Sequence, residues 1–322
     1  MTALQHQNSA FKTPLTDILG SKGHILVLRQ MVKLNSSTST SELLNRTGLS
    51  RQGAYNVVSR LLKTGILTYV GSGKKQQIKF NTDHPLTQQV RELFRAEKDR
   101  YDKFIKELKQ KIQDLEPQPK SAWIFGKIAK GTDEYGDPVR IALLGDVKSV
   151  DQMVDRFRNN LYKSSIEKKY DVTIEVRGIT LADRAVMNTH PVILLFGPDP
   201  QFYLVSSKDK RFSNKSHSSF DSRSLVDSEA WTEFLKMHPE VIQRTISWIE
   251  EYIHENPSGA GKELEEWKRI LESMTFQRLK KFLESDSERS TRLRQSMPFW
   301  PVLTEEEGEE LEAIKSQKSQ AK

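Results

Sequence analysis

The chain has 322 residues, of which 29% are charged and 36% hydrophobic, and it contains no cysteine. The lack of cysteine excludes disulfides, thiolate metal sites and cysteine nucleophiles. The seven histidines are scattered and no pair has metal-ligand spacing, so we expect neither a metal nor a cofactor. No apolar run approaches the roughly 18–20 residues of a membrane span, and the N-terminus lacks a signal-peptide core. We therefore expect a cytoplasmic protein with no membrane partner.

The positive charge is concentrated at the N-terminal end. Residues 1–85 contain 11 Lys or Arg against 3 acidic residues, a net charge of +8, whereas the rest of the chain contains 39 against 40. Such asymmetry favours a polyanionic partner, and nucleic acid is the first candidate. A nucleoid-associated location would follow.

The first 85 residues predict three helices and a hairpin. A helical pattern over 23–34 is followed by Ser39 and Glu42, which are spaced as a capping box and predict a short helix ending at Gly48. Ser50 is the expected N-cap of a third helix. Two short strands over 66–70 and 76–81 flank a basic, glycine-containing turn.

The third helix has one apolar and one polar face. Its expected buried stripe follows the i, i+3, i+4, i+7 pattern and comprises Ala54, Val57, Val58, Leu61 and Leu62. The opposite face presents Arg51, Gln52, Tyr55, Asn56, Ser59 and Arg60.

The run SELLNRTGLSRQGAYNVVSRLLKTGILTYVGSGKKQQIKF resembles the MarR/ArsR-like winged-helix regulators over about residues 20–85. The resemblance implies a winged helix-turn-helix that places the third helix in the major groove of double-stranded DNA. We expect base or near-base contacts from Arg51, Gln52, Tyr55 and Asn56, a further DNA contact from Ser59, and phosphate or minor-groove contacts from Arg60, Lys74 and Lys75. The alternative is a winged helix that binds protein.

A long helix is expected next, because neither glycine nor proline interrupts residues 86–116. Apolar residues alternate at spacings of four and three, as in a coiled-coil seam. These residues are Tyr101, Ile105, Leu108, Ile112 and Leu115. They predict a homodimer contact over 86–117, and the alternative is packing against the next domain of the same chain.

Residues 118–206 predict a small α/β domain. Strands are expected over 122–125, 140–144 and 172–176, with a helix over 150–169, and the segments 192–196 and 202–205 could extend the sheet.

The stretch WIFGKIAKGTDEYGDPVRIALLGD resembles the start of the minimal nucleotidyltransferases of the polymerase-β superfamily. That family has a serine after the glycine of its first turn and an Asp-x-Asp pair on its second strand, and those carboxylates bind magnesium. Here Lys127 replaces the serine, and Pro138 and Arg140 replace the two carboxylates. We therefore expect no catalytic residues and no nucleotidyl transfer. Gly126, Lys127, Lys130 and Arg140 could instead bind a nucleotide or another phosphate-bearing effector; the alternative is a structural or partner-binding platform.

The C-terminal third predicts a serine-rich linker or loop over 207–228 and a helical domain with a charged tail over 229–322. The segment 289–303, RSTRLRQSMPFWPVL, is either a docking site or an apolar segment that folds back on the helices.

The sequence as a whole predicts a mostly helical α+β multidomain protein. We expect a dimeric, sequence-specific DNA-binding transcriptional regulator with a degenerate nucleotidyltransferase-like domain. One alternative is an active nucleotidyltransferase that modifies a protein or RNA, and another is a DNA-bridging or maintenance protein of a mobile element.

Overall fold

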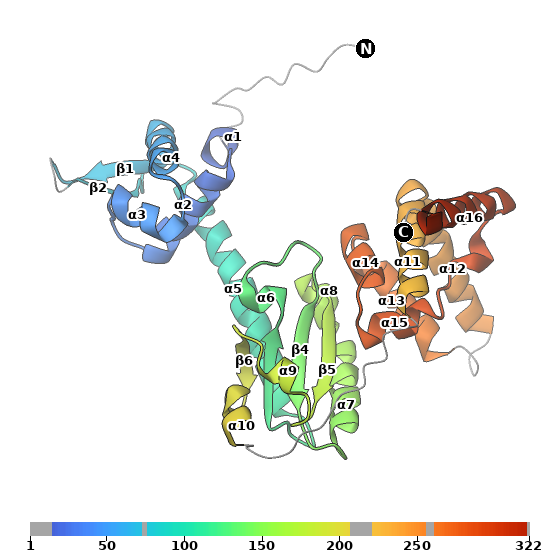
Figure 1. Ribbon diagram of the computed structural model, residues 1–322. Coiled ribbons are helices and arrows are strands. Elements are labelled where there is room, and N and C mark those ends of the chain that lie inside the picture. The colour runs from blue at the N-terminus through green and yellow to red at the C-terminus, as the bar shows by residue number, and fades with distance from the viewer. Residues whose placement is uncertain (1–14, 73–75, 207–220, 256–260, 321–322) are drawn as a thin grey trace, which may run out of the picture. The chain divides into compact units, whose positions relative to one another are not determined.

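A computed structural model describes residues 15–72, 76–206, 221–255 and 261–320 (Figure 1). The protein is α+β and mostly helical, as the sequence predicts. It divides into two compact units, residues 1–103 and 104–322. No helix among the described residues is long and apolar enough to cross a membrane.

The first unit has a core of helices and a two-stranded sheet. Its elements are α1 (Leu15–Ile18), α2 (Lys22–Leu34), α3 (Thr40–Thr47), α4 (Arg51–Lys63), β1 (Leu67–Val70), β2 (Gln77–Phe80) and the first part of α5 (Thr87–Gln113). In α4 the expected stripe is confirmed for Ala54, Val57, Val58 and Leu61, which are all buried, whereas Leu62 is partly buried.

Local hydrogen bonds fix the N-terminal ends of α3 and α4. The Ser39 hydroxyl accepts a hydrogen bond from the Glu42 amide at 3.1 Å, and the Ser50 hydroxyl accepts one from Gly53 at 3.1 Å, so both expected N-caps are confirmed. The Glu42 carboxylate, however, accepts from the Thr38 hydroxyl at 2.7 Å instead of closing the capping box. Gly48 ends α3 with φ at 66°, a left-handed conformation that glycine adopts without strain.

The hairpin has a third strand-like contact. Strands β1 and β2 pair antiparallel, from Leu67 opposite Phe80 to Val70 opposite Gln77. On the other side of β2, Thr38 forms an antiparallel bridge with Ile78 through hydrogen bonds of 2.9 and 2.8 Å. The segment that precedes α3 therefore ties the hairpin to the helices.

The second unit contains a four-stranded mixed sheet of order β5-β4-β3-β6. Its strands are β3 (Ser121–Phe125), β4 (Val139–Leu144), β5 (Ile174–Ile179) and β6 (Ile193–Phe196). β3 pairs antiparallel with both β4 and β6, whereas β4 and β5 are parallel. The strands expected around 122–125, 140–144, 172–176 and 192–196 are thus confirmed.

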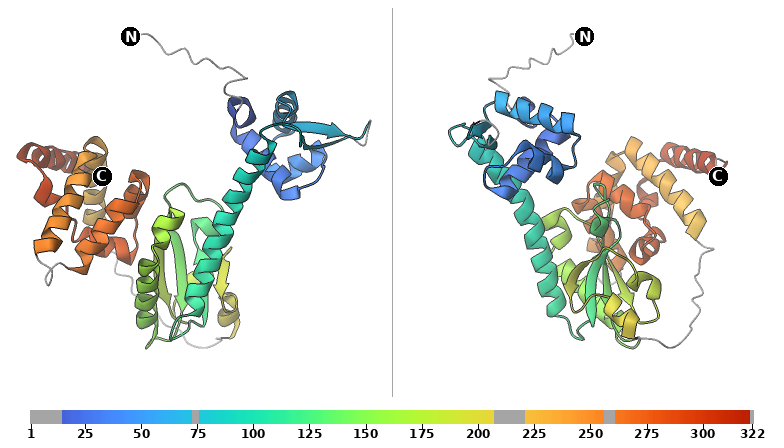
Figure 2. Two further views of the ribbon diagram at one scale, coloured as in Figure 1. Left: turned by 180° about the vertical axis from the view of Figure 1, so that it is seen from behind. Right: turned by 60° about the vertical axis from the view of Figure 1, so that its left-hand side comes forward.

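Helices cover both faces of this sheet (Figure 2). One face packs against the second half of α5, α7 (Val150–Lys163) and α8 (Ile166–Tyr170). The other face packs against α9 (Arg184–Met187) and α10 (Gln201–Ser206), and α6 (Lys127–Lys130) links β3 to β4.

The strand expected over 202–205 is wrong, because these residues lie in α10. Gly197 has φ at 69°, and the carboxylate of Asp199 accepts a hydrogen bond from the Gln201 amide at 2.9 Å. This turn starts a helix where the apolar residues alone indicate a strand.

The edge of the sheet at β5 is closed by arginine side chains. Three guanidinium groups, from α14, α15 and α7, donate to alternate carbonyl groups on the outer side of the strand and the residues before it. The pairs are Arg278 with Val172, Arg289 with Ile174 at 3.3 Å, and Arg158 with Val176 at 3.0 Å. The Ile174 amide on the same side donates to the Glu167 carboxylate at 2.7 Å.

The remaining helices form a second core in this unit, with Trp231, Trp267 and Phe299 buried at its centre. They are α11 (Asp221–Met237), α12 (Glu240–Glu255), α13 (Lys262–Ser273), α14 (Phe276–Leu283), α15 (Glu288–Arg294) and α16 (Glu305–Gln320), with a 3₁₀ turn over Trp300–Val302.

The linker predicted over 207–228 is wrong at its C-terminal end, because 221–228 belong to α11; residues 207–220 lie outside the described part. Burial of Ser228 and of the apolar residues after it explains the longer helix, which serine content alone does not indicate. Phe299 is fully buried and Arg294 donates to backbone carbonyls, so the segment 289–303 folds back on the helices.

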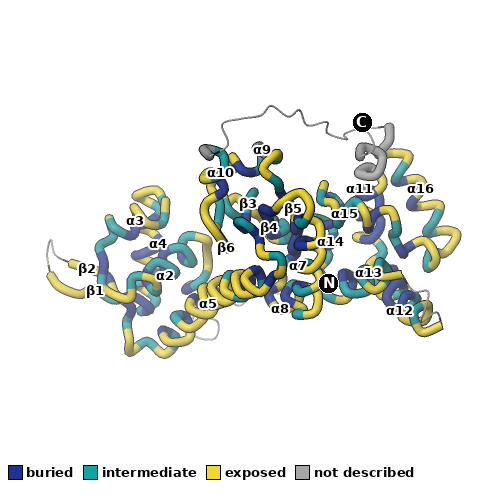
Figure 3. Tube along the Cα trace, turned by 90° about the horizontal axis from the view of Figure 1, so that it is seen from below, coloured by how far each residue is buried: buried dark blue, intermediate teal, exposed yellow. Residues whose placement is uncertain are grey.

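The predicted dimer seam on α5 is used inside the chain. Leu108, Ile112 and Leu115 are buried against the sheet core of the same chain, and Ile105 packs partly against it. Tyr101 remains 46% exposed, on the part of α5 that is exposed along most of its length (Figure 3). The alternative of packing on the chain's own next domain therefore holds for the C-terminal half of the seam.

This packing can be tested by truncating single side chains. We expect Leu108→Ala to lower the free energy of unfolding by about 2–5 kcal/mol, because it removes a fully buried side chain from the core. Tyr101→Ala, at an exposed position of the same helix, is expected to change it by about 0.5 kcal/mol. Denaturant unfolding measures both. Equal effects that vary with protein concentration would instead indicate an intermolecular seam.

Candidate functional site

Helix α4 presents a polar surface. Its six predicted DNA-contacting side chains are all exposed: Arg51, Gln52, Tyr55, Asn56, Ser59 and Arg60. Tyr55 is 47% exposed, so its ring and hydroxyl group are accessible to a ligand. The apolar stripe on the opposite side of α4 keeps this surface directed away from the core.

Two of these side chains are already oriented. The Gln52 amide donates to the Asn56 side-chain oxygen at 2.9 Å across one helical turn. The bond leaves each amide with further donors and acceptors for a ligand.

Four of the described cations on and beside α4 have no acidic partner among the described residues. Within the described residues, Arg51, Arg60, Lys63 and Lys79 form no ion pair, whereas Arg46 pairs with Glu42 at 2.9 Å. Lys79 is exposed on β2 beside the hairpin turn. Lys74 and Lys75, the predicted contacts of that turn, lie outside the described residues.

Arg140, the second residue of β4, makes the main contacts of the predicted nucleotidyltransferase-like site. It lies on β4 opposite Glu175 of the parallel strand β5, and its Nε donates to the Glu175 carboxylate at 3.1 Å. Its Nη2 donates to Asp286, between α14 and α15, at 2.8 Å. The Ser285 hydroxyl completes the arrangement with a 2.5 Å hydrogen bond to Glu175. A buried carboxylate is thus neutralised by a guanidinium where a metal site would need a second carboxylate.

The candidate phosphate-binding residues do not form a free cationic pocket. Lys127 pairs with Asp137 at 3.2 Å, and Asp137 also pairs with Lys281 at 3.3 Å. Burial acts to raise the pKa of Asp137, but its hydrogen bonds to the Glu134 amide and to these lysines lower it overall. Gly126 has φ at 82° beside the Arg140 side chain, and Lys130 is exposed on α6.

A cleft of about 610 Å³ does open beside Arg140. Its charged lining residues are the cations Arg140, Arg158 and Arg177 and the acids Asp151, Asp155, Glu175, Asp286 and Glu288. Five carboxylates against three guanidinium groups disfavour a phosphate-bearing ligand. Lys127 and Lys130 do not line this cleft.

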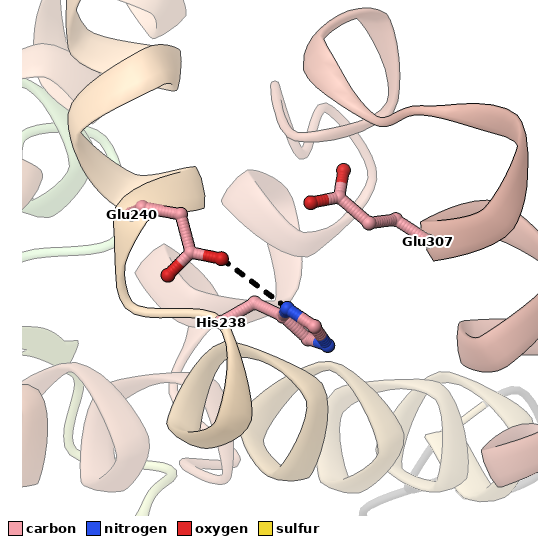
Figure 4. A group of neighbouring side chains, drawn as sticks. All are labelled: His238, Glu240 and Glu307. Carbon is pink, nitrogen blue, oxygen red and sulfur yellow. Dashed lines mark hydrogen bonds and ion pairs between the residues drawn. The ribbon is translucent and has the colours of Figure 1, made fainter.

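One group of described residues has the ligand atoms for a metal ion, His238 with Glu240 and Glu307 (Figure 4). Its atoms, however, are already paired with protein groups. His238 contacts Glu240 at 3.2 Å and Glu310 at 2.9 Å through its two ring nitrogens. Glu307 accepts from Arg244 at 2.5 Å and from the Thr304 amide at 2.9 Å. The Arg244 guanidinium therefore already neutralises Glu307, and the cluster is an ion-pair network that joins α12 to α16.

Several of these contacts were not predicted from the sequence. The Thr38 bridge comes from a single residue, too short for a strand pattern. Ser285 and Asp286 reach Glu175 and Arg140 from more than 100 residues away. Lys63 and Lys79 could have been found from the helical and strand periodicity that exposes them.

No family model matches the chain, and neither a curated protein nor a solved structure matches it. The functional inference therefore depends on the geometry described above.

The Arg140–Glu175 pair generates a stability prediction. We expect Arg140→Met to lower the free energy of unfolding by about 2–3 kcal/mol, a discounted range for a partly exposed guanidinium, because it leaves the Glu175 carboxylate buried without its charge partner. Lys120→Met is a matched control: the Lys120 side chain is 37% exposed and Arg140 38%, but the acidic partner of Lys120, Asp146, is 71% exposed and Glu175 only 7%. The control should lose about 1 kcal/mol or less. Equal losses in denaturant titrations would contradict the prediction.

The His238 network generates a pH prediction. Burial acts to lower the pKa of His238, but hydrogen bonds to Glu310 and Glu240 outweigh it and raise the pKa above its ordinary value. The protonated ring therefore stabilises the fold fully below about pH 6.5, and this contribution is lost as the pH rises through the folded-state pKa.

We accordingly expect the difference in melting temperature between the wild type and His238→Gln to be largest near pH 6 and to shrink toward alkaline pH. Tryptophan fluorescence is a suitable probe because four of the five tryptophans lie at or after residue 231. A difference that stays constant or grows with pH would rule out the protonated network.

Proposed function

We propose that the protein is a sequence-specific, double-stranded DNA-binding transcriptional regulator that reads DNA through α4. The observation that supports this most directly is the exposed polar face of α4, which carries two arginines, two amides and a tyrosine after a short, capped turn.

The arrangement of the first unit supports a winged helix-turn-helix. Gly48, Leu49 and Ser50 form a three-residue turn between α3 and α4, and the β1–β2 hairpin follows directly. The major groove of B-DNA admits one α-helix, and arginine, glutamine and asparagine side chains can pair with the edges of guanine and adenine. In this proposal α4 enters the groove and the hairpin contacts the adjacent backbone.

Electrostatics support DNA over protein as the partner. The cations Arg51, Arg60, Lys63 and Lys79 lack ion pairs with described residues, so each is available to a phosphate. Displacement of counterions from the DNA by such contacts contributes sequence-independent affinity.

For the four-stranded sheet we propose a structural or assembly role without nucleotidyl transfer. Glu175 is bound by Arg140 and Ser285, so a magnesium ion would have to displace a guanidinium to reach it. The acidic excess of the neighbouring cleft disfavours a nucleotide or phosphate-bearing effector there.

The first experiment is to sequence the DNA that copurifies with the full-length protein and to measure its affinity by fluorescence anisotropy. Enrichment of one sequence motif is expected for a regulator. Equal affinity for all sequences would contradict the proposal and favour the DNA-bridging alternative, and the absence of DNA binding would refute both.

Base readout predicts a sequence-dependent effect of the amides. Gln52→Ala or Asn56→Ala should weaken binding to the selected motif by about 1–3 kcal/mol and leave binding to unrelated DNA nearly unchanged. Gln110→Ala is the matched control, because Gln110 of α5 donates a similar hydrogen bond at 2.9 Å to Asp114, the residue directly after the helix. Equal weakening on motif and unrelated DNA would show that the amides do not read bases.

If Arg60 contacts a phosphate, its substitution should affect the salt dependence of DNA binding and not its sequence dependence. Arg60→Ala should weaken binding to every duplex and reduce the slope of log affinity against log salt concentration by about 1. Lys236→Ala, an exposed cation on α11, should leave the slope unchanged. A sequence-dependent loss with an unchanged slope would instead assign Arg60 to base readout.

A further inference from the structure

The two edge strands of the sheet, β5 and β6, differ in whether their outward backbone groups have hydrogen-bond partners. At β5, three arginines bond to the outward carbonyls of Val172, Ile174 and Val176, as described above. At β6, no described residue outside β3 bonds to the strand backbone. The outward amides and carbonyls of β6 therefore have no described protein partner.

The short edge strand β6 carries no charged side chain that would oppose pairing with another strand. Residues 191–198, PVILLFGP, contain no charge, and Leu194 is 38% exposed on the strand itself. Phe202, on the next helix, is 63% exposed. Edge strands of monomers commonly carry lysines or other charges that prevent pairing with another strand. Pro191 and Pro198 limit this open edge to the few residues between them.

A second copy of the chain is the occupant that these features favour. The strand that pairs with β6 should be apolar, uncharged and of similar length. The β6 strand of a second copy meets this description, and its pairing brings no like charges together. A winged helix also ordinarily reads a pseudo-palindrome as a two-fold dimer. The C-terminal half of the α5 seam is buried within the chain, so it cannot provide that two-fold contact.

We propose that β6 pairs antiparallel with β6 of a second copy, joining the two four-stranded sheets into one across a two-fold axis. The inference rests on the proposed function only in its expectation of a two-fold dimer. The two-fold axis relating two antiparallel neighbouring strands is perpendicular to the sheet, so each side chain and its symmetry mate lie on the same face. Side chains directly opposite each other also share a face. The centre of the pairing is therefore one residue opposite itself.

Leu194 is the residue expected at that centre. It is the exposed side chain of β6, and pairing it with its mate removes both leucines from water. Opposite residues in antiparallel strands have Cα atoms about 4.5–5.5 Å apart, within the range of a disulfide.

The first test is the mass of the full-length protein by light scattering over a dilution series. The wild type is expected at twice 37.1 kDa, and Leu194→Lys is expected at the monomer mass because it places two ammonium groups opposite each other. Leu181→Lys is the matched control, since Leu181 is 42% exposed in the same sheet domain, and it should remain dimeric.

The second test uses the lack of native cysteine. Leu194→Cys introduces the only thiol of the chain and should form a covalent dimer under mild oxidation, whereas Leu181→Cys should not. Circular dichroism of each variant establishes that it is folded.

Two results would overturn the inference: a monomeric wild type, or a Leu194→Lys variant that stays dimeric together with a Leu194→Cys variant that forms no crosslink. DNA affinity separates this failure from failure of the proposed function. A dimer that does not bind DNA would refute the proposed regulator and leave the β6 contact intact. A monomer that binds one DNA motif selectively would refute the β6 contact and support the regulator.

Discussion

The closure of the β5 edge by arginine is the interaction on which the second unit depends. An edge strand presents unpaired carbonyls that must be satisfied by protein or water. Here the side chains that satisfy them come from α14 and α15 as well as from the sheet domain's own α7. Arg278 is only 1% exposed, and it also donates to Asp171 at 2.8 Å. The C-terminal helices are thus held to the sheet by the same groups that complete its edge.

The Arg140 site belongs to this contact. A guanidinium on β4 both neutralises Glu175 on β5 and reaches Asp286 from the C-terminal helices. An aspartate at this position would repel Glu175 and Asp286 unless a cation bridged them. Arginine gives the same position fixed donors that pair with both carboxylates, so it joins the two strands to the C-terminal helices.

Much of the fold could be predicted from the sequence because its signals are local. The Ser39 and Ser50 caps, the left-handed Gly48 and the alternating hairpin each depend on a few adjacent residues. The polar face of α4 follows from the same periodicity that buries its apolar stripe. These levels agree with one another, as expected of a sequence that specifies one structure.

The sequence-based predictions were wrong or incomplete where contacts between residues far apart in the sequence determine the structure. The 4-3-4-3 spacing of α5 correctly indicates a buried stripe, but spacing cannot distinguish a partner helix from the chain's own sheet. Serine content around 221–228 suggests a loop, yet the buried aromatic residues further along α11 extend the helix. Likewise, the sequence shows an arginine at position 140 where the resemblance predicts a carboxylate, but it does not show the partners of Arg140, Glu175 and Asp286, which are 35 and 146 residues away.

The closed β5 edge also determines what kind of assembly the sheet can enter. A sheet with two open edges can add copies without limit, and such open-ended growth leads to fibres. With arginines bonded to the outward carbonyls of β5, β6 is the open edge of the sheet among the described residues, and the proposed pairing with an identical strand would occupy that edge in both copies. Addition of further copies through the sheet would therefore stop at the dimer, because the arginines block the second edge at which another strand could pair.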